Sequence, residues 1–261
     1  MNQHILENIL EPTVFEENRL AAHSDHKIYA NKNELLREQS SLYYSLNGIW
    51  KFNYSINPNC TPDGFEAYSY DCKSWEDIRV PAHIQMEGYD RPHYANVAYP
   101  WDGRQELLSG QSPIDFNPVA SYVKYFTLPA DFSKGDIILR MEGVESAAAI
   151  WLNGQYVGYC EDSFTPSEFD LTKYLSEGEN KLAIQVAKWC SGSWLEDQDF
   201  FRFSGIFRDI YLYTKPKCHL DDIGITQVFE NKNFDRVNLN ISLNINNNAK
   251  VKLTLFDALD M

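Results

Sequence analysis

The densest group of polar side chains lies between Ser191 and Arg208, in the stretch SGSWLEDQDFFRFSGIFR. Three carboxylates, Glu196, Asp197 and Asp199, fall within four consecutive positions and are flanked by aromatic residues. Carboxylate oxygens accept hydrogen bonds from sugar hydroxyls, and an aromatic ring packs against the apolar face of a sugar. The Asp199 carboxylate also suits a hard cation, which prefers oxygen ligands. The stretch therefore indicates a sugar site, with a solvated acidic loop between strands as the alternative.

A second candidate segment runs from Arg79 to Trp101, with the sequence RVPAHIQMEGYDRPHYANVAYPW. Proline, glycine and asparagine recur through it, so we expect a long ordered loop rather than a regular element. Long ordered loops frequently carry function. Asn96 offers an amide donor and an acceptor that suit a sugar hydroxyl, and an asparagine in an ordinary turn is the alternative.

The sequence contains no recognisable catalytic machinery. Hydrolysis of a glycoside requires two carboxyl groups about 5 Å apart for retention, or about 6.5–9.5 Å apart for inversion. Glu196 and Asp197 are adjacent, and no second acid is placed to work with either. The sequence has no G-x-S-x-G, P-loop or G-x-G-x-x-G pattern. His23 and His26 lie in a polar segment, and we do not expect them to ligate a metal.

Composition restricts the partners and the compartment. The 23 basic and 37 acidic residues give a net charge of −14, which disfavours binding to nucleic acid or to an anionic membrane. The N-terminus lacks the features of a signal peptide, so we expect a cytoplasmic protein. The five cysteines are odd in number and have no C-x-x-C pair, so free thiols are expected. A Cys60–Cys72 disulfide is the alternative.

Period-two hydrophobic patterns predict half-buried strands through most of the chain. They occur at Ile49–Tyr54, Ile137–Met141, Leu182–Ala187 and Ile206–Leu212. Asn153-Gly154 predicts a type I′ turn within a hairpin from Ala148 to Tyr159, because both residue types tolerate positive φ. An antiparallel sandwich of jelly-roll type is expected over 46–216. Residues 1–45 are expected to form a polar arm containing a short helix at Asn33–Ser41.

Pro216 is expected to end this domain. Beyond it, Val237–Ile245 alternates apolar residues with asparagine and serine, and Val251–Leu255 is expected to form the return strand of a hairpin. An immunoglobulin-type sandwich requires about 100 residues, whereas residues 217–261 number only 45. We therefore expect these strands to begin an incomplete immunoglobulin-like domain, and the chain to be the N-terminal piece of a longer protein.

Several stretches resemble the N-terminal part of bacterial β-galactosidases of glycoside hydrolase family 2. They are NRLAAH at 18–23, LNGIWKF at 46–52, the segment 80–101, VGYCEDSFTPSEFDL at 157–171 and WLEDQDFFRFSGIFRDI at 194–210. The LNGxWxF pattern is shared with β-glucuronidases. The EDQD and SGIFRD patterns are specific to the galactosidase branch.

The resemblance implies an all-β chain, with a galactose-binding-like jelly roll followed by the start of an immunoglobulin-like domain. The catalytic TIM barrel, with its nucleophile, its acid/base glutamate and its magnesium ligands, would lie outside this chain. Asp199 would bind a galactosyl hydroxyl and a sodium ion, and Asn96 would bind another hydroxyl.

The resemblance also implies that the full-length protein is a homo-oligomeric, retaining enzyme acting on terminal β-D-galactosides such as lactose. The chain alone is expected to be inactive and to require no cofactor. The alternatives are a stand-alone carbohydrate-binding module and another family 2 glycosidase, such as a β-glucuronidase or a β-mannosidase.

Overall fold

A computed structural model describes the chain except for residues 1–3, 131, 133–134, 197–198 and 257–261. The described residues are mostly β. They divide into two compact units. The larger unit consists of the residues up to Ala22 together with Tyr29–Thr214. The smaller unit consists of His23–Ile28 together with the residues from Lys215 onward. The description below takes each unit by itself.

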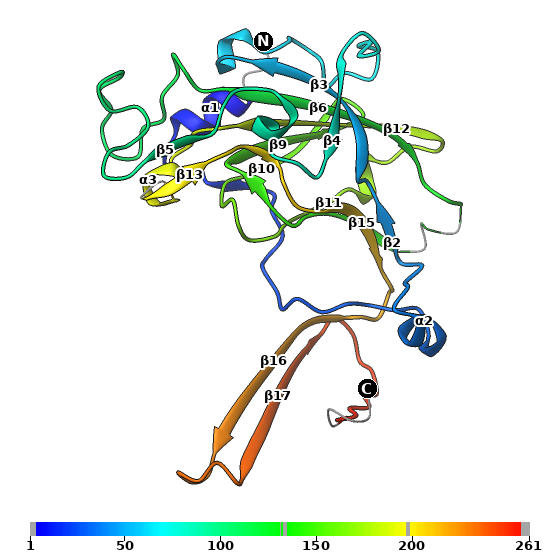
Figure 1. The fold of residues 1–261 in the computed structure, drawn as a ribbon. Helices are drawn as coiled ribbons and strands as arrows, with labels where there is room; N and C mark the ends of the chain where they lie inside the picture. The colour runs from blue at the N-terminus through cyan, green and yellow to red at the C-terminus, as the bar shows by residue number, and fades with distance from the viewer. Residues whose placement is uncertain (1–3, 131, 133–134, 197–198, 257–261) are drawn as a thin grey trace. The chain divides into compact units, whose positions relative to one another are not determined.

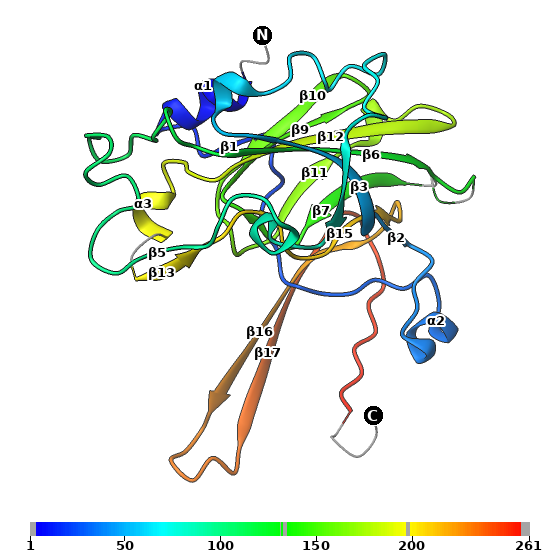
Figure 2. The ribbon, with the colours of Figure 1, turned by 45° about the horizontal axis from the view of Figure 1, so that its top comes forward.

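The larger unit contains two main sheets (Figures 1 and 2). The first has seven strands in the order β1 (Glu16–Glu17), β10 (Gln155–Cys160), β9 (Ala147–Leu152), β12 (Glu179–Ala187), β6 (Val119–Thr127), β3 (Gly48–Ser55) and β4 (Glu76–Val80). All neighbours in this sheet are antiparallel. The second has four strands in the order β11 (Ser167–Asp170), β7 (Asp136–Met141), β15 (Ile210–Lys215) and β2 (Tyr43–Ser45).

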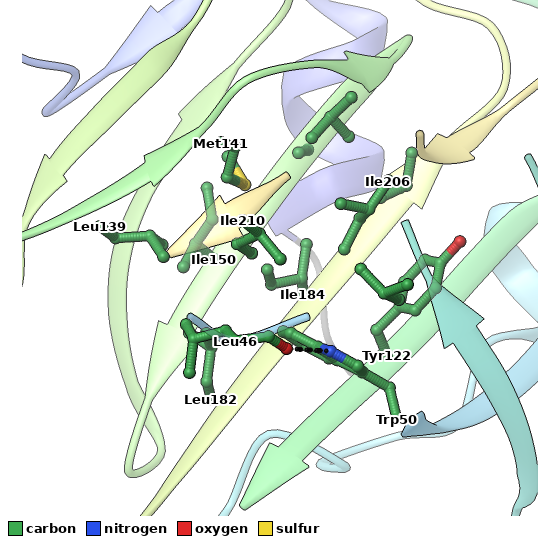
Figure 3. Close-up of a cluster of buried hydrophobic side chains, with 14 of the residues drawn as sticks. Leu46, Trp50, Tyr122, Leu139, Met141, Ile150, Leu182, Ile184, Ile206 and Ile210 are labelled. Atoms are coloured by element: carbon green, nitrogen blue, oxygen red, sulfur yellow. Dashed lines mark hydrogen bonds between the residues drawn. The ribbon is translucent and has the colours of Figure 1, made fainter. Parts of the chain in front are cut away.

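The main hydrophobic core lies between these two sheets. Trp50, Tyr122, Ile150 and Ile184 from the first sheet belong to one buried cluster with residues of the second sheet, among them Leu139, Met141, Ile210 and Leu212. Trp50 is buried, and its indole Nε1 donates to the Leu46 carbonyl at 2.8 Å (Figure 3). This hydrogen bond compensates for burying the indole N–H. The structure confirms the antiparallel β-sandwich predicted from the alternation.

The outer face of the seven-stranded sheet is covered as well. Helix α1 (His4–Leu10) inserts Ile5 and Ile9 into a second buried cluster, which includes Trp151 from β9 and Tyr159 from β10. Strands β9 and β12 are consequently buried on both faces. The expectation of half-buried strands was therefore wrong here. The covering helix has only seven residues, too few for a clear hydrophobic stripe in the sequence.

Lys181 on β12 fastens a loop over this outer face. Its ammonium Nζ donates to three backbone carbonyls, those of Phe65 at 2.7 Å, Ala67 at 2.7 Å and Tyr70 at 2.9 Å. The side chain is fully buried, and burial lowers the pKa of its ammonium group. A single cation thus satisfies three carbonyl groups of the loop, which holds Phe65 in the second cluster.

Several local predictions are confirmed. The hairpin of β9 and β10 turns at Asn153 and Gly154, whose φ angles are 53° and 82°. The short helix α2 (Lys32–Arg37) and strand β3 lie where they were expected. The described residues of this unit also include three short 3₁₀ helices, η1 (Pro58–Cys60), η2 (Ile84–Glu87) and η3 (Thr172–Tyr174).

The expected strand over Ile206–Leu212 is two separate elements. Strand β14 (Gly205–Ile206) pairs with β8 (Val144–Glu145), whereas β15 begins at Ile210 in the four-stranded sheet. The alternation misled because Ile206, Ile210 and Leu212 all reach the same core. The chain changes its pairing partner between β14 and β15, while its apolar side chains stay in the same core.

The smaller unit is built on an antiparallel hairpin of β16 (Leu220–Phe229) and β17 (Val237–Ile245). One face is largely apolar, with Ile225 opposite Ile241 and Phe229 opposite Val237. The strand at Val237–Ile245 is confirmed, but the return strand at Val251–Leu255 is wrong, because residues 251–256 form no strand. The preceding strand β16 is the partner of β17.

All five cysteines are free thiols, so neither the Cys60–Cys72 disulfide nor any other forms. Cys72, Cys160 and Cys190 are buried, and Cys60 and Cys218 are exposed. Within the described residues, no helix has the length and apolar character that a membrane crossing demands.

Candidate functional site

A small ladder joins the two segments that the sequence singled out. Strand β5 (His93–Ala95) pairs antiparallel with β13 (Phe200–Arg202), and Ala95 lies opposite Phe200. The two strands lie side by side in both ribbon views (Figures 1 and 2). The expectation that 79–101 contains no regular element was wrong, because its polar run includes β5. A strand of three residues that pairs with a distant segment leaves no signal in a local window.

The register brings the two predicted sugar-binding residues together. Asn96 directly follows Ala95, and Asp199 directly precedes Phe200. Because Ala95 and Phe200 are partners, Asn96 and Asp199 lie at the same end of the ladder, although they are far apart in the sequence. Both residues are exposed, and the Asn96 amide makes no hydrogen bond to another described residue.

Asp199 is held by its backbone conformation and by one side-chain contact. Its φ angle is 54°, in the left-handed region that aspartate tolerates better than most residues. Tyr94 on β5 donates its hydroxyl to Asp199 Oδ1 at 2.5 Å. Because Tyr94 needs its phenolic proton to donate this hydrogen bond, the contact with Asp199 raises the pKa of Tyr94. The contact fixes one carboxylate oxygen and leaves Oδ2 without a partner among the described residues.

Exposed aromatic rings surround these polar groups. Tyr94 and Phe201 are tilted partners with ring centroids 5.0 Å apart, and Phe200 packs edge-on against Phe164 at 5.6 Å. Phe200 and Phe201 are 46% and 56% exposed, which is unusual for large apolar side chains lying together. The ladder thus presents a carboxylate and an amide beside an apolar surface, the combination that a sugar or a second protein surface can use.

Glu196 serves the structure rather than a ligand. It ends helix α3 (Ser193–Glu196), and its carboxylate accepts from the Ser163 amide at 2.9 Å and the Ser163 hydroxyl at 2.7 Å. The sequence suggested two interpretations for Glu196, a solvated acidic loop or a sugar acceptor. Its contacts with Ser163 fit neither of them. Asp197, the other acid of the run, lies outside the described residues.

Strand β13 of the ladder also carries one member of a buried ion pair, and β8 carries the other. Glu145 Oε1 and Arg202 Nη1 are 4.0 Å apart, and each side chain is 2% exposed. Burial raises the pKa of Glu145 to about 7, against the opposing influence of Arg202. Burial likewise lowers the pKa of Arg202 to about 10. Both pKa shifts favour the uncharged form of the side chain. At this distance, neither charge therefore compensates fully for the burial of the other.

His83 borders the same pair. Its ring stacks on Phe207 with centroids 4.9 Å apart, and its Nδ1 lies 3.8 Å from Glu145 Oε2. Burial lowers the pKa of His83, which favours its neutral form. Sequence reasoning missed Glu145, which lies in a stretch whose pattern indicates only packing. His83 lies within the candidate loop 79–101, but nothing in its type or spacing singled it out.

The described residues hold no cluster of three or more histidine, cysteine or acidic side chains suited to a metal. His23 and His26 lie close together, with ring centroids 5.4 Å apart, but no third ligand of this kind joins them. Asp199 can therefore supply one carboxylate to a cation, and the remaining ligands would have to come from other groups.

Residues 43–216 match the family described as "Glycosyl hydrolases family 2, sugar binding domain". The match covers most of the chain and nearly all of its sandwich, so the chain belongs to glycosyl hydrolase family 2. Its curated relatives include the β-galactosidase of Halalkalibacterium halodurans, 55% identical over 213 residues that cover 81% of this chain and 21% of that protein. The β-galactosidase of Clostridium acetobutylicum is 43% identical, with 98% of this chain and 28% of that protein covered.

A third relative, the β-galactosidase large subunit of Latilactobacillus sakei, is 46% identical and is matched over 84% of this chain and 37% of its own length. The chain thus spans between about a fifth and somewhat over a third of these relatives. Among solved structures, a β-glycosidase from Bacteroides vulgatus has a TM-score of 0.57 at 22% identity, covering 80% of this chain and 25% of that one. A likeness at that identity shows the shared fold.

Proposed function

We propose that the chain is the N-terminal sugar-binding part of a retaining β-galactosidase, which removes terminal non-reducing β-D-galactose from substrates such as lactose. The observation that carries the proposal is the β5–β13 register, which places Asn96 and Asp199 together at an exposed edge. The named relatives at 43–55% identity support the substrate class. The catalytic TIM barrel and its glutamates would lie in a further part of the polypeptide.

In this proposal the ladder forms one wall of the sugar pocket. Asn96 and Asp199 bind galactosyl hydroxyls, and the barrel completes the pocket against the exposed rings of β13. The Asp199 carboxylate fits a sodium ion as one oxygen ligand, because its Oδ1 accepts from Tyr94 while Oδ2 faces no described partner. Sodium bound there would neutralise the carboxylate and orient sugar hydroxyls. Magnesium would bind to residues of the barrel.

The finer domain assignment belongs to the same proposal. Residues 1–45 form an arm, 46–216 a galactose-binding-like jelly roll, and 217–261 the first strands of an immunoglobulin-like domain. The apolar face of β16 and β17 supports the last part, because a two-stranded sheet requires further strands to bury such a face. The complete protein would be cytoplasmic and homo-oligomeric.

A second candidate is a carbohydrate-binding module that holds a sugar without cleaving it. The observation in its favour is that Asp199 and Asn96 lie at one exposed edge beside exposed aromatic rings, a combination that can bind a sugar without a catalytic pair. This candidate differs from the first in a measurable way. It requires that the 261-residue chain bind galactose by itself with millimolar affinity or better, whereas an incomplete pocket would bind much more weakly.

The test is to determine the coding sequence beyond Met261 and to assay the complete product on chromogenic β-galactoside, β-glucuronide and β-mannoside substrates. We expect hydrolysis of the galactoside by the complete protein and none by the 261-residue chain. Asp199→Asn should lower kcat/KM by about tenfold to a hundredfold, the effect of losing a hydrogen bond to a charged group. Asp77→Asn, a surface carboxylate on β4, is the matched control.

Two outcomes would contradict the proposal. One is preferential hydrolysis of the glucuronide or mannoside by the complete protein. The other is wild-type kinetics in Asp199→Asn. Millimolar galactose binding by the 261-residue chain, measured by calorimetry, would favour the stand-alone module instead.

A further inference from the structure

The β5–β13 ladder is too short to hold itself in place. It consists of three residue pairs, and Asn96 and Asp199 lie at one end of it. A two-stranded pairing of this length has little stability of its own. At the other end of the ladder, His93 is paired with Arg202. The position of the exposed edge therefore depends on what joins the two chain segments beyond that second end.

The side chain of Gln85 joins these two segments. Gln85 lies in η2 and is buried, and its Nε2 donates to the Ser204 hydroxyl at 2.9 Å. Its Oε1 accepts from the main-chain N–H of Ser204 at 2.9 Å, and its Nε2 also donates to Asp90 Oδ2 at 3.1 Å. Ser204 lies two positions after β13, and Asp90 lies three positions before β5. We call Gln85, Asp90 and Ser204 the Gln85 clamp.

Two further contacts attach the Gln85 clamp to the sandwich. The main-chain N–H of Ile84 donates to the Ser204 carbonyl at 2.9 Å, so η2 is bonded to the chain after β13 by its backbone as well. Lys188, the residue after β12, pairs with Asp90 at 2.5 Å, and the two side chains are 1% and 5% exposed. The acidic partner of Gln85 is thus held by a buried cation next to a central strand of the seven-stranded sheet.

The chemistry of the amide explains why glutamine occupies this position. Gln85 uses both of its N–H donors and its carbonyl oxygen, so one side chain bonds a hydroxyl, a main-chain N–H and a carboxylate. A buried polar network whose members are satisfied fixes directions and distances that an apolar side chain of the same size leaves free. The Gln85 clamp therefore sets the separation of the segments that lead into β5 and out of β13.

We propose that Gln85 is a positioning residue: its amide clamps Asp90 to Ser204 and so sets the β5–β13 ladder at which Asn96 and Asp199 meet. Within the described part of the chain, Gln85 hydrogen-bonds to neither sugar-binding residue, so it acts through the two strands. The role of the Asn96 and Asp199 edge in sugar binding rests on the proposed function. The Gln85 clamp itself rests on the contacts given above.

The first experiment tests the clamp without any activity. Gln85→Met keeps the size of the side chain and removes its hydrogen bonds. If opening the ladder breaks the clamp, hydrogen exchange of the 261-residue chain at 93–95 and 200–202, measured by mass spectrometry, should become about tenfold faster or more in this variant. Ser204→Ala removes only the hydroxyl contact and should give a smaller increase at the same residues. It keeps the test valid if Gln85→Met folds poorly.

Asn180→Ala is the matched control. Asn180 is also a buried amide that donates and accepts, but it lies at the end of β12 remote from Lys188. Its side chain accepts from the Ser176 N–H at 2.9 Å and donates to the Gly178 carbonyl at 3.1 Å. Its loss should speed exchange in the core strand β12, which opens only when the sandwich unfolds. Exchange in the ladder should stay within about twofold of wild type, because the ladder opens without breaking the Asn180 contacts.

The second experiment measures the consequence in the complete protein. Gln85→Met should raise KM for a chromogenic galactoside by about tenfold, because the edge no longer holds its two sugar-binding groups together. Ser204→Ala should raise KM less. A variant that merely lowers the amount of folded enzyme lowers the maximal rate but not KM. Asn180→Ala should accordingly leave KM within about twofold of wild type.

The outcomes separate the two proposals. Faster exchange in β12 with unchanged exchange in the ladder, in both Gln85→Met and Ser204→Ala, would overturn the positioning role. So would a wild-type KM in Gln85→Met when Asp199→Asn impairs turnover. Faster ladder exchange in Gln85→Met combined with wild-type kinetics in Asp199→Asn would keep the clamp and overturn the proposed function of Asp199.

Discussion

Replacing the buried Glu145 by glutamine should change how the stability of the chain depends on pH. In the folded chain the pKa of this carboxyl is raised to about 7, from an ordinary value of 4.5, chiefly by burial. Between these two values the folded state holds a proton that the unfolded state has released. Raising the pH through this window therefore destabilises the wild-type chain. The stabilising contribution is complete below about pH 4.5 and is lost as the pH rises through about 7.

The size of the effect follows from the shift. One pKa unit corresponds to about 1.4 kcal/mol, so between pH 5 and pH 8 the group should lower the free energy of unfolding by about 2.5 kcal/mol. The side chain is 2% exposed, so screening by solvent is small. Glu145→Gln occupies nearly the same volume and cannot titrate. Its stability relative to wild type should therefore improve by about 2.5 kcal/mol between pH 5 and pH 8.

Urea unfolding of the 261-residue chain at several pH values measures this difference directly. Titrations of groups far from Glu145 are shared by both chains and cancel when the two curves are subtracted. Glu177→Gln removes the same charge from an exposed turn and should run parallel to wild type. If Glu145→Gln also runs parallel to wild type, or loses relative stability as the pH rises, the description of Glu145 as a poorly compensated buried acid is wrong.

Three further predictions concern other contacts. Lys181→Met should lower the free energy of unfolding by about 3 kcal/mol or more in urea titrations, because three carbonyls lose a charged donor; a change below about 1 kcal/mol would contradict this. Gly158→Ala should cost about 1–3 kcal/mol by the same assay, because a Cβ there would lie 2.4 Å from the Glu17 carbonyl oxygen, and an unchanged midpoint would contradict the packing described. Tyr94→Phe should raise KM and the sodium requirement of the complete protein several-fold by freeing the Asp199 carboxylate, with unchanged steady-state kinetics as the opposing result.

Features encoded by neighbouring residues were predictable from the sequence. The turn at Asn153 and Gly154 needs two residues that tolerate positive φ, and the strand at Ile49–Tyr54 shows its alternation directly. The sandwich followed from such local patterns. Covering of the outer face by α1 did not, because whether a strand is half or fully buried depends on what packs against it from elsewhere in the chain.

The sequence singled out the residues of the candidate site, but it did not predict how the fold brings them together. Asn96 and Asp199 stood out by side-chain chemistry and by resemblance, yet only the three-residue pairing of β5 with β13 brings them to one edge. Glu145 carried no signal, because a single acid in a mostly apolar stretch is indistinguishable in sequence from an exposed one. The role of Glu196 was misjudged for the complementary reason. Its partner, Ser163, lies in another segment and gives no sign of the contact in the sequence.

The most direct test of the central claim is a crystal structure of the complete protein with a non-hydrolysable galactose analogue bound. The claim is that the β5–β13 edge forms one wall of a galactoside pocket whose reacting groups lie in the rest of the polypeptide. We expect the Asp199 carboxylate and the Asn96 amide within hydrogen-bonding distance of the sugar hydroxyls, roughly 2.6–3.2 Å. A sugar bound away from this edge, with both side chains in solvent or covered by another domain, would contradict the claim.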